Sequence, residues 1–93
     1  MKLGSAIKRC RQIKSLTQEM LAKQADLSKS HLSLVEKGQR ELSLDALNRI
    51  AKALDVPIQL IMYLAAEPSE LKEMNASLKT EFDRLILDLL KDD

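Results

Sequence analysis

Hydrophobic positions recur at helical spacing throughout the first 66 residues, in five segments separated by short polar breaks. The first segment, residues 1–14, predicts an amphipathic helix with these inward positions: Leu3, Ala6, Ile7, Cys10 and Ile13. Two short segments follow, one after Thr17 and one over residues 29–37, with these inward positions: Leu21, Ala22, Ala25, Leu32 and Val35. The fourth segment follows Ser43 and has these inward positions: Leu44, Leu47, Ile50, Ala51 and Leu54. The pattern predicts an all-α fold.

Residues at the segment boundaries support the same division. Thr17, Ser28 and Ser43 carry side-chain oxygens that cap a helix N-terminus. Gly38 is suited to end the third helix, and Pro57 is suited to begin a fifth that runs to about residue 66. This fifth segment is apolar on nearly every side, so we expect other residues to cover it all round.

A second apolar pattern follows the break at Pro68 and Ser69. Residues 70–91 predict a helix about 33 Å long, with apolar residues at coiled-coil-like steps of 3, 4, 4, 3 and 4. This apolar stripe could pack against any of three partners: the fifth helix of the same chain, the same helix of a second copy, or a different protein. We expect pairing with a second copy and some contact with the fifth helix, through these residues: Leu60, Tyr63, Leu64, Leu71, Met74, Leu78, Phe82, Leu85 and Leu89.

Charge and length divide the chain in a similar way. Ninety-three residues suffice for one modest core, so we expect one domain at residues 1–66 and a C-terminal helix within residues 67–93. Residues 1–40 hold nine basic and three acidic residues, a net charge of +6, whereas the remainder holds six basic and eleven acidic residues, a net charge of −5. Basic charge gathered in one part favours a polyanionic partner, because each neutralised phosphate releases counterions.

Several classes of site are excluded by what the chain lacks. Cys10 and His31 are the only cysteine and histidine, so we expect no internal disulfide, no metal site and no cofactor. No nucleophile–base pair, paired carboxylates or glycine-rich phosphate loop indicates an enzyme. The chain has no apolar run long enough to span a membrane and no signal-peptide pattern, so we expect a cytoplasmic protein.

Two short helices separated by only Asp26 and Leu27 form a helix-turn-helix pattern, in which the second helix can enter the major groove of DNA. Residues 16–38, LTQEMLAKQADLSKSHLSLVEKG, closely resemble the signature of the Cro/C1-type family of bacterial and phage regulators, the XRE family. The matching positions are Thr17, Gln18, Glu19, Leu21, Ala22, Leu27, Ser28, Ser30, Leu32, Ser33, Val35, Glu36 and Gly38. The resemblance covers residues 3–66 and implies a five-helix lambda-repressor-like DNA-binding domain, to which the C-terminal dimerisation helix is added.

The turn departs from the family pattern at Asp26. The family usually has glycine there, because the position tends to need a left-handed backbone. Aspartate tolerates this region better than most residues. We therefore expect the fold to be kept, with slight strain in the turn.

The resemblance also implies which residues contact double-stranded DNA. It places Gln18 on a phosphate, which positions the protein without specifying sequence; the alternative is that Gln18 only supports the helix cap. On the outer face of the 29–37 helix, Ser30 and Ser33 would contact base edges, Lys29 a guanine or a phosphate, and Leu34 a thymine methyl or the domain's own core. The full set of predicted DNA-binding residues is Thr17, Gln18, Ser28, Lys29, Ser30, His31, Ser33, Leu34, Lys37 and Arg40.

Further roles follow from the same resemblance. Arg11 and Glu36 stand where the family has an internal ion pair between the first and third helices. His31 stands at a position that is often aromatic and would reach the sugar-phosphate backbone. Arg40, in the loop after the recognition helix, would touch the backbone or minor groove, or remain a solvated charge.

These expectations favour a transcriptional regulator, a repressor or dual regulator that binds a two-fold symmetric operator as a homodimer with half-sites about 34 Å apart. It would act by blocking or contacting RNA polymerase. Restriction-modification controller proteins and the antitoxin of a toxin pair are alternatives within the same class. A protein-interaction module that uses its C-terminal helix, as some antirepressors do, is the alternative from a different class.

Overall fold

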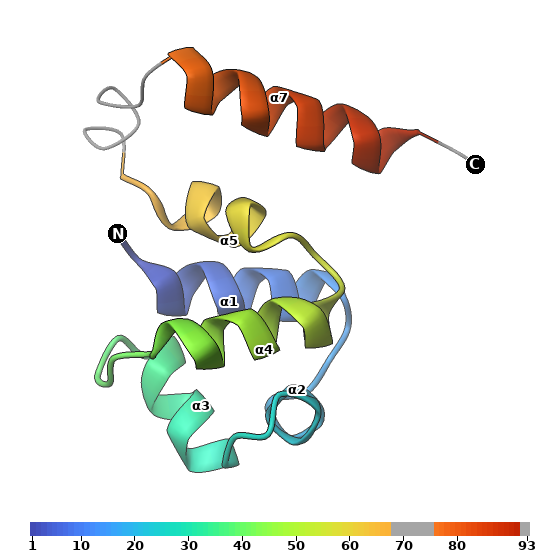
Figure 1. Ribbon diagram of the computed structural model, residues 1–93. Helices are drawn as coiled ribbons and strands as arrows, with labels where there is room; N and C mark the ends of the chain where they lie inside the picture. The colour runs from blue at the N-terminus through green and yellow to red at the C-terminus, as the bar shows by residue number, and fades with distance from the viewer. Residues whose placement is uncertain (68–75, 92–93) are drawn as a thin grey trace.

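The computed structural model describes residues 1–67 and 76–91, and these residues form helices without strands. The helices are α1 (Leu3–Ile13), α2 (Gln18–Gln24), α3 (Lys29–Glu36), α4 (Leu44–Leu54), α5 (Ile58–Ala65) and α7 (Ala76–Leu90). In Figure 1, α2 and α3 lie at one end of the molecule and α7 lies beside α5 at the other. The predicted all-α fold, with five helices before residue 67, is confirmed.

Three helices begin where side-chain caps were predicted. The hydroxyl oxygens of Thr17, Ser28 and Ser43 accept hydrogen bonds from the backbone N–H three residues ahead, at 3.1, 3.0 and 3.1 Å. Each bond satisfies a donor that the helix itself leaves unpaired, and removing such a cap costs about 1 kcal/mol. The caps therefore set the start, and hence the direction, of α2, α3 and α4.

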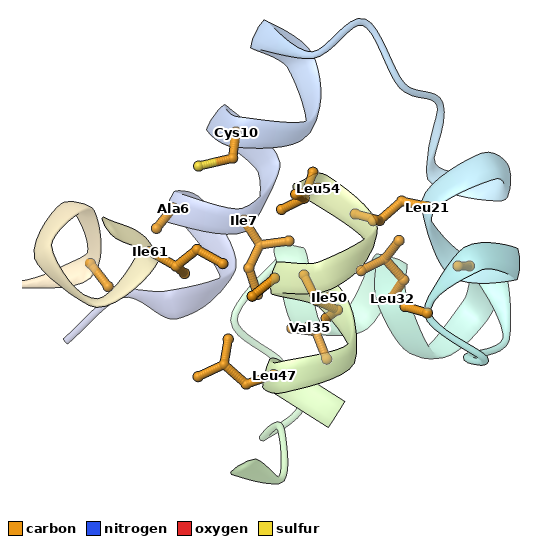
Figure 2. Close-up of a cluster of buried hydrophobic side chains, with 14 residues drawn as sticks. Ala6, Ile7, Cys10, Leu21, Leu32, Val35, Leu47, Ile50, Leu54 and Ile61 are labelled. Carbon is orange, nitrogen blue, oxygen red and sulfur yellow. The ribbon is translucent and has the colours of Figure 1, made fainter. Parts of the chain in front are cut away.

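One hydrophobic core joins the first five helices. α1 contacts α3, α4 and α5, and α2 contacts α3 and α4. Figure 2 shows side chains from these helices converging on one cluster, whose largest fully buried members are Ile7, Leu21, Leu32, Ile50, Leu54 and Ile61. Truncating one such side chain to alanine costs about 2–5 kcal/mol, because a cavity remains. The core thus fixes the orientation of α2 and α3 relative to α1 and α4.

Two residues predicted to face inward are instead exposed. Ile13 is 72% exposed because it is the last residue of α1, and the chain turns away from the core at Ser15, where φ is 58°. Leu44 is 68% exposed because it is the first residue of α4 and precedes the turn that meets the core. Ile13 and Leu44 thus continue the helical stripe in the sequence but lie at helix ends that the core does not cover.

α1 approaches α3 closely at Gly4. A Cβ atom placed on Gly4 would lie 2.0 Å from the carbonyl oxygen of Val35, nearer than any real side chain comes to a backbone atom. Glycine at this position lets the start of α1 pack directly on the end of α3. No role for Gly4 was predicted from the sequence.

The C-terminal helix α7 packs on α5 of the same chain. The rings of Tyr63 and Phe82 lie 5.3 Å apart between centroids, and Phe82 is 8% exposed. The other predicted dimerisation residues here vary in exposure: Leu60, Leu64 and Leu85 are half-buried, and Leu89 is exposed. Leu71, Met74 and the side chain of Leu78 lie outside the described residues. None of the described helices combines the length and apolar character needed to cross a membrane.

Candidate nucleic-acid interface

The turn between α2 and α3 closes with a backbone motif that normally uses glycine. The N–H of Leu27 donates to the carbonyl of Ala22 at 2.8 Å, and the N–H of Asp26 donates to that of Lys23 at 3.3 Å. These two bonds define a Schellman motif, which needs a left-handed residue at its centre. Asp26 takes that conformation, with φ of 55°, as the sequence analysis expected.

A side chain from α4 supports this turn. Arg49 donates through Nε to the carbonyl of Ala25 at 2.8 Å, and its Nη1 is paired with the carboxylate of Asp45 one turn earlier on α4. The guanidinium thus ties the end of α2 to α4. This role of Arg49 was not predicted from the sequence, where the only signal for it was the i, i+4 spacing of Asp45 and Arg49.

A buried polar cluster ties both ends of the helix-turn-helix to α1. Arg11 donates to the Glu36 carboxylate from Nε at 2.8 Å and from Nη2 at 3.0 Å, and its Nη1 reaches the carbonyl of Leu16 at 2.9 Å. Gln18 adds a bond from Nε2 to Glu36 Oε1 at 3.0 Å. The side chains of Arg11 and Glu36 are only 11% and 2% exposed. This cluster fixes the start of α2 relative to the end of α3.

The predicted base-reading face forms an open hollow beside the start of α2. Its lining residues are Gln18, Lys29, Ser30, Ser33 and Leu34. Lys29 and Ser30 are exposed and Ser33 and Leu34 are half-buried, whereas Leu32 and Val35 on the opposite face of α3 are buried. The structure therefore brings the predicted phosphate anchor and four predicted reading residues together around one surface.

The hydroxyls at the helix starts have a structural task in addition to any contact with DNA. The oxygens of Thr17 and Ser28 accept the cap hydrogen bonds, which leaves their O–H groups as donors. Of the two ring nitrogens of His31, Nε2 is buried without a hydrogen-bond partner in the described part of the chain. The contact of the His31 ring with the DNA backbone stays a prediction.

Two predicted contacts lie beyond the hollow. Lys37 caps the C-terminus of α3 and Arg40 lies in the loop before α4, and both are exposed. They line a second hollow, next to the start of α1. The predicted contacts thus extend from the start of α2 along α3 and into the following loop.

Cys10 takes no part in this surface. It lies in the core, where burial raises the pKa of its thiol above the ordinary value although nearby Arg9 and Lys14 lower it. The thiol is therefore protonated at neutral pH and unreactive. Among the residues that the structure describes, no group of three or more His, Cys, Asp or Glu side chains is placed to hold a metal ion.

Comparisons with known proteins agree with this geometry. A family model described as helix-turn-helix matches residues 7–61. An uncharacterized HTH-type transcriptional regulator of Mycobacterium tuberculosis is 35% identical over 80 residues, which are 84% of this chain and 57% of that protein. The immunity repressor protein of Bacillus phage phi105 is 32% identical over 84 residues, which are 90% of this chain and 56% of the repressor. The chain thus spans a little over half the length of these relatives.

A solved structure extends the likeness to three dimensions. The restriction-modification controller protein C.AhdI from Aeromonas hydrophila superposes with a TM-score of 0.63 at 37% identity, over 64% of this chain and 91% of that one. The family model covers all of α2, α3 and α4 and parts of α1 and α5. The chain therefore belongs to the helix-turn-helix family of the Cro/C1 type, the XRE family.

Proposed function

We propose that the protein is a sequence-specific transcriptional regulator, a repressor, that binds a two-fold symmetric DNA operator as a homodimer with α3 in the major groove. One observation carries this proposal: Gln18, Lys29, Ser30, Ser33 and Leu34 meet on a single open surface of α2 and α3. A recognition helix needs such a face, with polar groups for base edges and an adjoining anchor for the phosphate backbone.

The contacts on this face divide into two kinds. Ser30, Ser33 and Leu34 are placed for base edges, because serine hydroxyls pair with any base and a leucine side chain fits a thymine methyl. Lys29 serves a guanine or a phosphate. Gln18 donates one of its two Nε2 hydrogens to Glu36, and the second hydrogen remains to donate to a phosphate oxygen beside the N-terminus of α2. The phosphate contacts set the register, and the bases select the sequence.

The C-terminal segment would provide the contacts between the two copies of the dimer. Residues 1–66 would form the DNA-binding domain and residues 67–93 the oligomerisation segment. In one copy, the side chains of Leu87, Leu89 and Leu90 on α7 are 62%, 54% and 75% exposed. Apolar side chains gathered on one helix end favour a partner, and a second copy would supply the second recognition helix that a two-fold operator needs.

The likeness to C.AhdI favours a second candidate within the same class, a controller protein of a restriction-modification system. Both candidates bind DNA directly, need no cofactor and perform no catalysis, and both act in the cytoplasm where bacterial and phage DNA lies. A methyltransferase or nuclease gene beside this one would favour the controller.

Selection of binding sites from random duplex DNA tests the proposal. We expect an enriched motif of two inverted half-sites, with centres about 10 base pairs or a multiple of that apart. An enriched motif without internal symmetry would refute the homodimer. The absence of any enrichment, with the protein folded, would refute sequence-specific DNA binding.

A further inference from the structure

The start of α1 lies against the far end of the recognition helix and its following loop. A hollow of about 690 Å³ opens between them, lined by Lys2 from the start of α1, Lys37 from the end of α3, and Arg40 and Glu41 from the loop. Figure 1 shows the start of α1, the end of α3 and the α3–α4 loop on the same side of the molecule. Three cationic side chains and one carboxylate line this hollow, so its net charge is positive.

Two contacts fix Lys2 at this place. The backbone N–H of Lys2 donates to the carbonyl of Ala65, the last residue of α5, at 2.7 Å. Two residues later, Gly4 lets the helix lie against the carbonyl of Val35 on α3. Lys2 is therefore held between α5 and α3, and its position beside Lys37 is a property of the packed domain.

This hollow shares no lining residue with the base-reading face, but both lie along α3. Lys37 lies on the same side of α3 as Ser30 and Ser33, because these positions follow one another at helical spacing. DNA lying along α3 would pass from the first hollow, lined by Lys29, to the second. The backbone of a double helix carries a phosphate every few ångströms, so a cationic hollow at this place faces phosphate.

We propose that Lys2, Lys37 and Arg40 form a second phosphate site, which holds a DNA backbone phosphate beyond the bases that α3 reads. This inference rests on the proposed DNA-binding function and adds α1 to the interface. The site supplies affinity without sequence preference, since a phosphate is the same in every operator. The Glu41 carboxylate weakens the site and limits its contribution.

The salt dependence of DNA binding tests this site directly. The wild-type protein, Lys2→Gln and Lys8→Gln are titrated against one selected operator duplex and one random duplex between about 50 and 200 mM salt. Lys8 is an exposed lysine of the same helix outside the hollow, so its variant makes the same change in charge. Thermal unfolding confirms that all three proteins are folded.

The slope of log K against log salt is negative, and loss of one phosphate contact reduces its magnitude by about 0.9. A dimer loses two such contacts, so its slope becomes shallower by about 1.8. We expect that decrease for Lys2→Gln on both duplexes, none for Lys8→Gln, and a wild-type slope for Lys2→Arg. The affinity advantage of the wild type over Lys2→Gln then shrinks about tenfold across this salt range. Glu41→Gln should bind both duplexes more tightly.

The outcomes separate this site from the proposed function. Equal slopes for Lys2→Gln and Lys8→Gln, with tight operator binding by the wild type, would overturn the second phosphate site alone. A loss confined to the operator duplex would also overturn it, because a contact with a base would then be indicated. A wild-type protein that binds neither duplex would overturn the proposed function itself.

Discussion

Four helices of the domain end in the same backbone motif, and only one of them uses glycine for it. The left-handed positions are occupied by Ser15, Asp26, Gly38 and Asp55, with φ between 55° and 75°. A non-glycine residue in this conformation costs about 1–2 kcal/mol, less for aspartate. At Asp26 this strain lies within the helix-turn-helix itself.

Replacing Asp26 by glycine should therefore stabilise the protein. We expect a gain of about 0.5–1 kcal/mol, because the released strain is partly offset by the greater freedom of glycine in the unfolded chain. For a domain of this size the melting temperature would rise by about 2–8 °C in thermal unfolding. Asp26→Ala is the matched control, since alanine keeps the Cβ atom, and it should lower the melting temperature. Equal shifts for both variants would contradict strain as the cause.

The Arg11–Glu36 pair predicts a large effect from a single substitution. Glu36→Ala leaves the Arg11 guanidinium buried without its carboxylate, which costs about 3–5 kcal/mol. Denaturant unfolding measures this loss. The exposed pair of Asp45 and Arg49 provides the control, because Asp45→Ala should cost about 1 kcal/mol or less. A similar loss for the two variants would show that burial does not determine how much an ion pair contributes to the free energy of unfolding.

Residue roles could be anticipated where they follow from local sequence. The caps at Thr17, Ser28 and Ser43 required only a hydroxyl before an apolar run, and the pairing of Arg11 with Glu36 came from the family resemblance. The bond between Gln18 and Glu36 joins residues 18 positions apart, and the bond from Arg49 to the Ala25 carbonyl spans 24. No periodicity reveals such contacts, because they arise only when whole helices pack.

At the scale of elements, the interface depends on how closely α1 packs on α3. A methyl group on Gly4 would meet the backbone of Val35, and the carbonyl there cannot move without shifting α3. Gly4→Ala should thus destabilise the domain by about 1–3 kcal/mol in denaturant unfolding, despite the higher helix propensity of alanine. Ser5→Ala, on the exposed side of the same helix, should change stability little. An unchanged Gly4→Ala variant would mean that the two helices do not touch as described.

The helices were more predictable in number and order than in their ends. Stripes of buried residues identified five helices before residue 67, yet Ile13 and Leu44 at helix ends were assigned to the wrong side. For α7, spacing identified an apolar helix but could not choose its partner. The described structure places Phe82 against Tyr63 of the same chain, which leaves other faces of α7 for a second copy.

At the scale of the whole molecule, the proposed dimer can be tested separately from folding. Leu87 and Leu90 are 62% and 75% exposed in a single chain, so glutamate at both positions should leave the domain folded. In light scattering the mass of this variant should fall toward the 10.5 kDa of one chain, and operator affinity should fall through lost bivalency. Glu81→Gln, an exposed polar change on the same helix, is the control. If the double variant is still a dimer, the interface between the two copies does not include Leu87 and Leu90.

The proposed function assigns base reading to α3 and phosphate binding to the residues around it. The most direct test repeats the selection from random DNA with Ser30→Ala and Leu34→Ala, alongside Arg40→Gln as a loop cation outside the reading face. The two α3 variants should change base preference at fixed positions in each half-site. Arg40→Gln should return the wild-type motif with weaker binding to all DNA. An unchanged motif for both α3 variants would contradict the account.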